Sequence, residues 1–501
     1  MSLRWVSCFI LASLWSTELF GLDLARIRRS VFKIDVVSQS PSFSHPWIQG
    51  HQKSGSGTGF YIGGNRILTN AHVVANGKYI TVQRDGDDRS MIAKPVYLGH
   101  DCDLAILEVE DVSVFEDAVP LRFTGLPKLR RVVAVIGYPR GGEQISITEG
   151  VVSRLSYRRY AHSGYHRHLL VQVDSAINPG NSGGPVVQGD RVVGVAFQAY
   201  TDAENTGYII PSPVIRRFLK DIEDGRYDGH PEHGLIVLNG VMVNPAMRKF
   251  HKLKESDGGV KVGYVAGFAP TYGKIKKGDI LLEIDGQPIG LDGKIDFRGE
   301  RISFKVIFDL RQMGDVVDFK VSRQGQELNI PVKVTPSKPH HFMANIYAKF
   351  PRYDIFAGLV FSSLSRDYLK VWGKKWFRQA PIHLRYLHWY HLEIPRYKNS
   401  QELVVLSGRL PSGVNTHIGH FEEGVIDEVN GVKISSLEEL RPALEQGGSD
   451  YIVIKLWKEP VPIVLPRKKA FEAHPEIIKQ YGVYPERWLE PVAIFDRGNN
   501  G

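Results

Sequence analysis

Cysteine is almost absent from this chain of 501 residues, which has only Cys8 and Cys102. Two distant thiols exclude a disulfide scaffold, and without a second thiol near Cys102 a structural zinc ribbon is excluded too, so we expect no metal site. A Gly-x-x-x-x-Gly-Lys-Ser/Thr loop is also missing, which excludes a built-in ATP motor, and we expect no cofactor. Beyond the N-terminal leader, no stretch reaches the roughly 18 uninterrupted apolar residues of a membrane helix.

Charge of one sign is only mildly in excess. Lys and Arg number 63 against 54 Asp and Glu, a net charge of +9, which permits anionic partners but does not call for nucleic acid, so no nucleic-acid partner is expected. Hydrophobic residues make up 43% and charged residues 23%, as in an average folded protein. The length predicts three or four domains rather than one.

The N-terminal segment 1–21 has the pattern of a secretory signal peptide. It starts with Met-Ser-Leu-Arg, continues through an apolar stretch from Trp5 to about Leu14, and ends at Phe20-Gly21. A basic start, a short apolar core and a small residue at the end predict export with cleavage near Gly21. A secreted protein or an uncleaved signal anchor are the alternatives, and no stable membrane span is expected after cleavage.

Short apolar runs separated by glycine-rich corners extend from Ile27 to about Pro213. Runs of this length and spacing predict an all-β sandwich or barrel without β-α-β alternation. Ser212-Pro213, followed by apolar residues at helical spacing, predicts a capped amphipathic helix that closes the domain before Asp224-Gly225.

Three motifs in this β domain carry candidate chemistry. His72 follows a sharp turn of a strand, Asp103 precedes an apolar strand, and Ser182 lies in the glycine-rich turn Gly180-Asn-Ser-Gly-Gly. Alone, each has a plain structural explanation: a packed histidine, a turn cap and an ordinary hairpin. Together they supply a nucleophile, a base and a carboxylate that orients the base, in the chain order of the chymotrypsin-type hydrolases.

These residues resemble the HtrA/Deg family of PDZ-containing serine endopeptidases. The matching motifs are Thr69-Asn-Ala-His72-Val-Val, Asp103-Leu-Ala-Ile-Leu, Gly180-Asn-Ser182-Gly-Gly-Pro, Val133-Ala-Val-Ile-Gly-Tyr-Pro139 and Glu149-Gly-Val-Val-Ser153. The resemblance implies a mainly β fold, with a chymotrypsin/trypsin-like double β-barrel over residues 22–225. It makes Ser182 the nucleophile, His72 the general base and then acid, and Asp103 the residue that orients His72.

The same resemblance implies an oxyanion hole and a specificity pocket. The oxyanion hole would consist of the backbone amides of Gly180, Asn181 and Ser182. The residues at the pocket positions are Ile177, Val195, Ala196, Phe197 and Gln198. Because no aspartate occurs there, we expect cleavage after small aliphatic residues rather than after Arg or Lys.

Basic and aromatic residues are interleaved between Arg154 and His168. Such a segment can bind nucleic acid or an anionic surface, but a solvated loop between two strands is the simpler interpretation. In the HtrA/Deg family a loop at this position relays activation, which makes Arg158 and Arg159 candidate regulatory residues.

Two further units follow the protease domain. The first, over 230–335, resembles a PDZ domain in its Gly278-Asp279 and Asp285-Gly286 turns, and we expect a helix over 301–313 in it. Its candidate peptide-binding loop is Gly234, Leu235, Ile236 and Val237, with C-terminal peptides as possible ligands. A divergent PDZ-like α+β copy is expected over 340–465, with a mixed tail over 466–501. This pattern resembles the plant-type two-PDZ Deg proteases and their bacterial relatives.

The resemblance therefore implies an ATP-independent protease that removes unfolded or misfolded polypeptides in protein quality control. It further implies an exported, periplasmic location, a stress response and a homo-oligomer, a trimer or a multiple of three. A chaperone or binding scaffold with a secondary or silent triad is the alternative.

Overall fold

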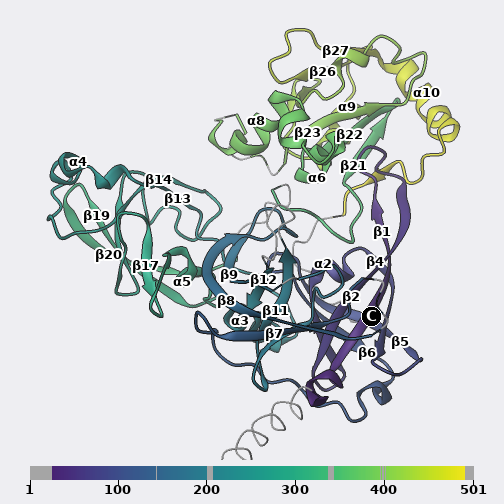
Figure 1. The fold of residues 1–501 in the computed structure, drawn as a ribbon. Helices are drawn as coiled ribbons and strands as arrows, with labels where there is room; N and C mark the ends of the chain where they lie inside the picture. Colours follow the sequence, from purple (N-terminus) through teal and green to yellow (C-terminus); the bar gives the residue numbers. More distant parts are fainter. Residues whose placement is uncertain are drawn as a thin grey trace, which may run out of the picture. The chain divides into compact units, whose positions relative to one another are not determined.

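The computed structural model of this chain describes residues 25–490, apart from residues 141, 143, 176, 200–206, 337–342, 395, 398, 399 and 401. The predicted leader 1–21 lies outside the described residues. Contacts divide the chain into two compact units: residues before Gln39 together with Lys53–Lys338, and Gln39–Gln52 together with the described residues from 343 onward (Figure 1). No helix in the described ranges is long and apolar enough to cross a bilayer.

The first unit begins with a closed six-stranded barrel in the order β1-β2-β3-β6-β5-β4. Its elements are β1 (Val31–Pro41), β2 (Gln49–Gly63), β3 (Arg66–Thr69), α2 (Ala71–Val74), β4 (Gly77–Arg84), β5 (Ser90–Gly99) and β6 (Leu104–Val109). Alternation of buried and half-buried side chains along β1 gives one apolar face, with Phe32, Ile34 and Val36 in the barrel core.

A second closed barrel follows, in the order β10-β11-β12-β9-β8-β7. Its elements are β7 (Val132–Gly137), β8 (Ser146–Arg159), β9 (Arg167–Val173), β10 (Pro185–Gln188), β11 (Arg191–Ala199), β12 (Gly207–Pro211) and the closing helix α3 (Ser212–Asp221). Pro213 near the start of α3 fits the predicted helix. The two barrels confirm the predicted mainly β, trypsin-like fold.

The basic and aromatic segment between Arg154 and His168 is a β-hairpin, so the expectation of a solvated loop is wrong. β8 runs to Arg159 and pairs with β9 in the register Arg158↔His168. Tyr160 is fully buried in the turn and donates a hydrogen bond to the Leu169 carbonyl at 2.8 Å. Tyr160, His162 and His168 are buried, and Tyr157, Tyr165 and His166 are half-buried. This burial orders the segment.

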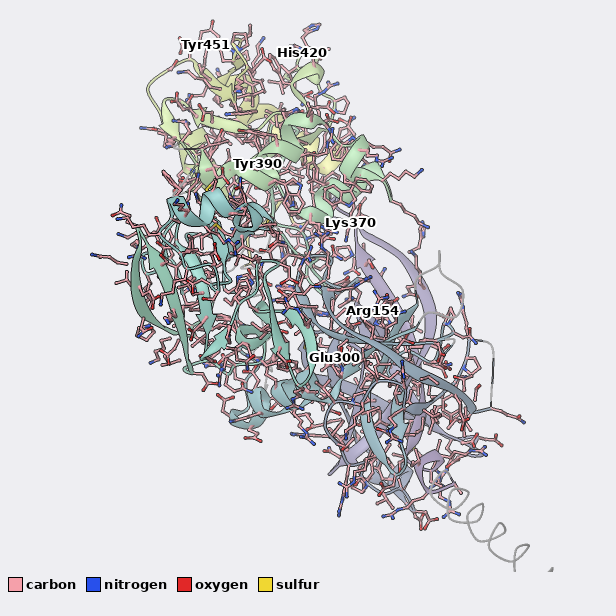
Figure 2. All side chains as sticks on the ribbon, turned by 60° about the vertical axis from the view of Figure 1, so that its left-hand side comes forward. Arg154, Glu300, Lys370, Tyr390, His420 and Tyr451 are labelled. Atoms are coloured by element: carbon pink, nitrogen blue, oxygen red, sulfur yellow. The ribbon has the colours of Figure 1, made fainter. Side chains whose placement is uncertain are left out.

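The region predicted as a first PDZ domain, here called the first PDZ-like region, contains a sheet in the order β13-β14-β15-β19-β20, with β16 paired to β15, and a separate hairpin of β17 and β18. Its elements are β13 (Leu235–Leu238), α4 (Pro245–Phe250), β14 (Val260–Val265), β15 (Ile280–Ile284), β16 (Gln287–Pro288), β17 (Lys294–Phe297), β18 (Glu300–Ser303), α5 (Lys305–Asp309), β19 (Val316–Arg323) and β20 (Gln326–Lys333). β18 lies beside β8 of the second barrel, where Figure 2 labels Glu300 and Arg154.

The helix expected over 301–313 is wrong in its extent. The segment begins as strand β18, and the helix α5 covers only five residues. Ile302 and Phe304 are buried while Arg301 is exposed, which is the period-two pattern of a strand rather than a helix.

The second unit contains two four-stranded sheets, β23-β22-β21-β28 and β25-β24-β26-β27. Its elements are β21 (Tyr353–Phe356), β22 (Leu359–Ser363), α6 (Arg366–Leu369), α7 (Trp376–Gln379), α8 (Ile382–Tyr390), β23 (Val404–Arg409), β24 (Ile426–Val429), β25 (Val432–Lys433), α9 (Leu437–Glu445), β26 (Tyr451–Leu456), β27 (Ile463–Pro466), α10 (Arg467–Gln480) and β28 (Arg487–Trp488). Residues 39–52 belong to this unit, where the Trp47 ring lies 6.4 Å from the Tyr353 ring.

Residues after 466 are folded into the second unit up to at least Trp488. Helix α10 buries Ala470 and Ile477, and β28 pairs with β21. Ile477 packs in a cluster with Tyr353, Ile355 and Val360. The segment predicted as a mixed tail therefore supplies one wall of this unit's core.

We predict that Ile477→Ala lowers the free energy of unfolding of the second unit by about 2–5 kcal/mol, because it leaves a cavity in this cluster. Glu476→Ala is the matched control: Glu476 is exposed on the same helix, and its loss is expected to cost within about 0.5 kcal/mol. Chemical denaturation followed by tryptophan fluorescence measures both. Equal stability of the two variants would show that α10 does not contribute to the core.

Candidate active site

Ser182 lies in a tight turn between β9 and β10 that only glycine can form. Gly180 and Gly183 have φ angles of +103° and +87°. A Cβ on Gly180 would lie 2.3 Å from the Tyr138 carbonyl oxygen, and one on Gly183 would lie 2.1 Å from the Thr58 carbonyl oxygen. Both glycines are therefore required for the backbone to double back at the serine.

The backbone amides of this turn differ in whether they are hydrogen-bonded. Asn181 donates to the Asn178 carbonyl at 3.0 Å, so its amide is already used. In the part of the chain that the structure describes, the amides of Gly180 and Ser182 have no acceptor. Of the three amides expected to bind an oxyanion, these two are the available donors.

His72 and Asp103 lie at the same end of two paired antiparallel strands in the first barrel. His72 lies on α2 directly after β3, and Asp103 immediately precedes β6. One carboxylate oxygen of Asp103 lies 2.6 Å from His72 Nδ1, and the other accepts the His72 backbone amide at 2.7 Å. Asp103 is fully buried with φ +55°, and the Asn70 side chain donates to its carbonyl at 2.9 Å. Asp103 thereby fixes both the ring and the backbone of His72.

The environment of His72 favours its protonated form. Burial opposes the charge, but the Asp103 carboxylate outweighs burial and raises the pKa of His72. About a third of the side chain, 32%, remains exposed, so a proton can exchange with solvent or substrate. The Asp103 contact also assigns the Nδ1 proton, which leaves Nε2 as the basic nitrogen.

The Ser182 hydroxyl points to an acceptor other than His72 in this structure. Its hydroxyl donates to the Phe197 carbonyl at 3.2 Å, and no hydrogen bond among the described residues joins it to the His72 ring. The Phe197 ring lies 6.4 Å from the His72 ring. The Ser182 side chain must therefore change its rotamer before its hydroxyl can hydrogen-bond to His72, the base that would activate it.

Thr58 of β2 joins the two barrels at this point, and sequence reasoning missed it. Its amide donates to the Ser182 carbonyl at 2.9 Å, and its hydroxyl donates to the Gly180 carbonyl at 2.8 Å. The same hydroxyl accepts the Tyr138 amide at 2.9 Å. Only the Gly-Thr-Gly context of the motif hints at this role, because the partners lie 80 or more residues away.

The residues expected to line the specificity pocket divide between two cores. Ile177 and Ala196 are buried in one cluster with Ile209, whereas Val195 and Phe197 are buried in the larger core. A Cβ on Gly207 would lie 2.7 Å from the Ile177 side chain, so Gly207 keeps space beside it. Gln198 lies on β11 opposite Tyr208, and its side chain is outside the described set.

The remaining predicted site residues are on the β8–β9 hairpin and in the first PDZ-like region. Arg158 is half-buried and contacts Tyr208, with its guanidinium 5.9 Å from the ring centroid, while Arg159 is exposed. In the first PDZ-like region, Gly234 has φ +64°, Leu235 is buried and Ile236 is 58% exposed on the edge strand β13.

Two six-stranded barrels with a histidine, a buried aspartate and a turn-borne serine at their junction define a trypsin-like serine endopeptidase. The trypsin-like peptidase domain family matches residues 57–195, and a PDZ domain family matches residues 343–487. The chain is 36% identical to the putative mitochondrial protease Do-like 3 of Arabidopsis thaliana over 92% of its own length and 79% of the relative. It is 35% identical to the chloroplastic protease Do-like 2 of the same plant, over 93% and 76%. The chain belongs to the Do-like, or HtrA/Deg, family of PDZ-containing serine proteases.

Solved structures of HtrA-type proteases are also similar. The HtrA-type protease AlgW with tripeptide aligns with 64% of this chain and 98% of its own, at 22% identity and a TM-score of 0.49.

We predict that Thr58→Val lowers kcat/KM by about 10- to 100-fold. Valine keeps the shape but leaves the buried Gly180 carbonyl and Tyr138 amide unpaired, at about 1–3 kcal/mol each. Thr58→Ser is the matched control, since it keeps the hydroxyl and should stay within a few-fold of the parent. Steady-state cleavage of an unfolded substrate measures both, and an unimpaired valine variant would contradict the role of Thr58.

We predict an acid limb in the pH profile of kcat/KM. The base acts as neutral imidazole, so activity falls as pH drops through the raised pKa of His72. Asp103→Asn removes the cause of that rise, so its limb should move to lower pH while kcat drops by about 10⁴-fold. Rates measured across the pH range at subsaturating substrate show the shift, and an unmoved limb would assign it to another group.

Proposed function

We propose that this chain is an ATP-independent serine endopeptidase that cleaves unfolded or misfolded polypeptides in protein quality control, under regulation by its PDZ domains. The observation that carries the proposal is the Asp103–His72 pair beside a serine turn with two available amides. Unfolded polypeptides can present an extended backbone to Ser182, whereas folded proteins keep most of their backbone inside secondary structure.

The proposed reaction begins when the Ser182 hydroxyl turns from the Phe197 carbonyl to His72 Nε2. His72 takes the proton as the oxygen attacks a peptide carbonyl, and the amides of Gly180 and Ser182 receive the developing oxyanion. The protonated imidazole then gives the proton to the leaving amine, and water hydrolyses the acyl-enzyme by the same route in reverse. Asp103 holds the imidazole throughout and stabilises its charged form.

We infer the preferred residue before the cleaved bond from the apolar residues assigned to the specificity pocket. Ile177 and Ala196 offer hydrocarbon, and no carboxylate is among the residues assigned to the pocket. A charged side chain bound there would lose its hydration without a partner. Small aliphatic residues before the scissile bond are therefore favoured over Arg and Lys.

The first PDZ-like region is proposed to bind C-terminal peptides along β13. This strand is at the edge of its sheet, so its free backbone groups suit an added strand. Lys305 Nζ donates to the Leu235 carbonyl at 3.1 Å, directly at the candidate loop. Burial, helped by Arg167, lowers the pKa of Lys305 to about 8, and an arriving carboxylate would offset that cost.

The proposal also includes an oligomeric state and a cellular compartment. We infer a homo-oligomer, a trimer or a multiple of three, with Arg158 and Arg159 on the β8–β9 hairpin as contacts that relay activation. The predicted leader supports export to a periplasm-like compartment. The names of the relatives, mitochondrial and chloroplastic, raise an organelle as the competing location.

A fluorophosphonate probe tests the nucleophile in the full chain. The wild type should be labelled and should degrade reduced, alkylated casein without added ATP, whereas Ser182→Ala should do neither. Peptides with a free C-terminal carboxylate should raise the rate, and their amidated forms should not, if PDZ binding regulates cleavage.

The alternative is a chaperone or scaffold with a silent triad, which the resting contact of Ser182 with Phe197 favours. It predicts that the chain suppresses aggregation of casein but is neither labelled nor proteolytic. That result would reject the protease proposal.

A further inference from the structure

A chain of buried hydrogen bonds connects the first PDZ-like region to the loop that carries Asp103. It starts at Asp101, two residues before the proposed catalytic acid and only 4% exposed. One carboxylate oxygen of Asp101 accepts the Tyr227 hydroxyl at 2.6 Å, and the other accepts the His230 amide at 2.7 Å. The loop 101–103 is thus held by groups that follow helix α3.

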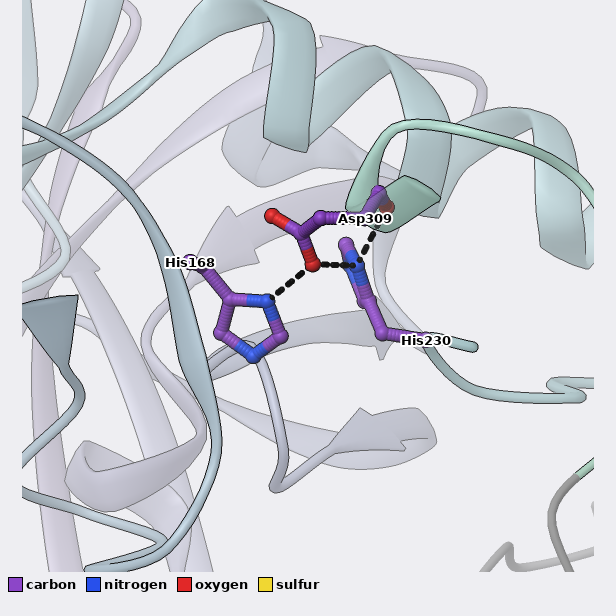
Figure 3. A group of neighbouring side chains, drawn as sticks. All are labelled: His168, His230 and Asp309. Atoms are coloured by element: carbon purple, nitrogen blue, oxygen red, sulfur yellow. Dashed lines mark hydrogen bonds and ion pairs between the residues drawn. The ribbon is translucent and has the colours of Figure 1, made fainter. Parts of the chain in front are cut away.

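His168 of β9 makes the next link, and both of its ring nitrogens face oxygen acceptors. Nε2 donates to the Asp101 carbonyl at 2.9 Å, and Nδ1 lies 2.7 Å from a carboxylate oxygen of Asp309 (Figure 3). A carbonyl and a carboxylate are acceptors only, so both nitrogens must carry protons to make both bonds. With Asp309 ionised, this geometry makes His168 an imidazolium.

Asp309 is the last residue of α5 and is 3% exposed. Its carboxylate oxygen also accepts from His230 Nδ1 at 3.2 Å. Nearby charge from His168 outweighs burial and lowers the pKa of Asp309, so the carboxylate remains ionised beside the imidazolium. The pair is a desolvated, charge-assisted hydrogen bond between the barrel and the PDZ-like region.

The groups that face His168 come from four elements. They are Asp101 from the loop before β6, Asp309 from α5, His230 from the segment after α3 with Arg217 behind it, and Tyr160 and His166 from the turn before β9. Burial opposes the charge on His168, but Asp309 and Asp101 outweigh it and raise its pKa. His230 is the neutral partner, because burial and Arg217 lower its pKa to about 4.

We propose that Asp309 and His168 are positioning residues for catalysis, which fix the backbone of Asp101 and through it the place of Asp103 against His72. The proposal rests on the proposed role of Asp103. Asp103 adopts a φ of +55°, which an L-residue does not favour, so its position depends on what holds the flanking loop. Release of the Asp101 carbonyl would remove one of those restraints.

The same three side chains, His168, His230 and Asp309, are close enough to hold a metal ion, with ligand atoms within 4.8 Å of one another. A metal would need a lone pair on a nitrogen of His168 that already points a proton at Asp309. The separation of 2.7 Å is that of a hydrogen bond, so a proton fits the cluster better than a cation does.

The test compares full-chain variants in kcat, KM and pH profile on reduced, alkylated casein. Asp309→Asn removes the charge with little change of shape, and we expect kcat to fall about 10- to 100-fold with KM changed little, as for a displaced catalytic group. Glu232→Gln is the matched control. It removes another histidine–carboxylate contact of this region, with His166 at 3.2 Å, and no hydrogen bond among the described residues joins Glu232 to loop 101–103.

The pH profile separates positioning from a general loss of stability. Because the pKa of His168 is raised, its contribution is present at low pH and is lost as pH rises through that pKa. The wild type should therefore show an alkaline limb, and in Asp309→Asn that limb should move to lower pH, since the carboxylate that raises the pKa is gone. Asp309→Glu should restore part of the loss.

Three outcomes decide the proposal. If wild type and Glu232→Gln are labelled by the fluorophosphonate probe while Asp309→Asn is labelled more slowly, and His168→Gln adds no further loss in the double variant, the proposal holds. If Asp309→Asn matches the wild type in kcat and alkaline limb while probe labelling is intact, it is overturned, with the protease function unaffected. It is also overturned if dialysed wild type binds one equivalent of zinc and Asp309→Asn does not.

Discussion

The active site depends on one residue that joins two barrels. His72 and Asp103 belong to the first barrel and Ser182 to the second, so no local structure can fix their separation. Thr58 does so with its amide and hydroxyl, which bond to Ser182, Gly180 and Tyr138 of the second barrel. Its carbonyl accepts from Thr69 of its own barrel. Because Thr58 is fully buried, these bonds are shielded from water, and they anchor the serine turn to β2 as well as to its own barrel.

Buried charge is the second constraint on this site. Asp101 and Asp103 lie on either side of buried Cys102, and an isolated carboxylate in such a place would be very costly. Each is compensated in a different way. Asp103 faces the His72 ring and amide, whereas Asp101 is surrounded by a hydroxyl and two amides and attracted by histidines. Burial opposes ionisation of Asp101, yet these partners lower its pKa, so Asp101 remains ionised inside the loop.

Much of this architecture could be predicted from the sequence, because the signals are local. The runs of β1 and β6, the glycines around Ser182 and the Pro213 helix start each involve residues a few positions apart. The links that tie the site together could not be read in this way: Thr58 lies 122 residues from Gly180, and His168 lies 141 residues from Asp309. The hairpin at Arg158 does not follow from the sequence, because its basic residues indicate a solvated loop while aromatic residues such as Tyr160 pack into the core.

Helix α5 contacts both the candidate peptide-binding strand and the buried His168. It is barely more than one turn long, and its first residue, Lys305, bonds the Leu235 carbonyl of the edge strand, while its last, Asp309, bonds His168. A peptide added along β13 would compete for the contact of Lys305. Val306 and Phe308, between these two residues, are buried in the core and fix the turn that joins them. In the proposed function, peptide capture at Leu235 and the placement of Asp103 would therefore meet at the two ends of one short element.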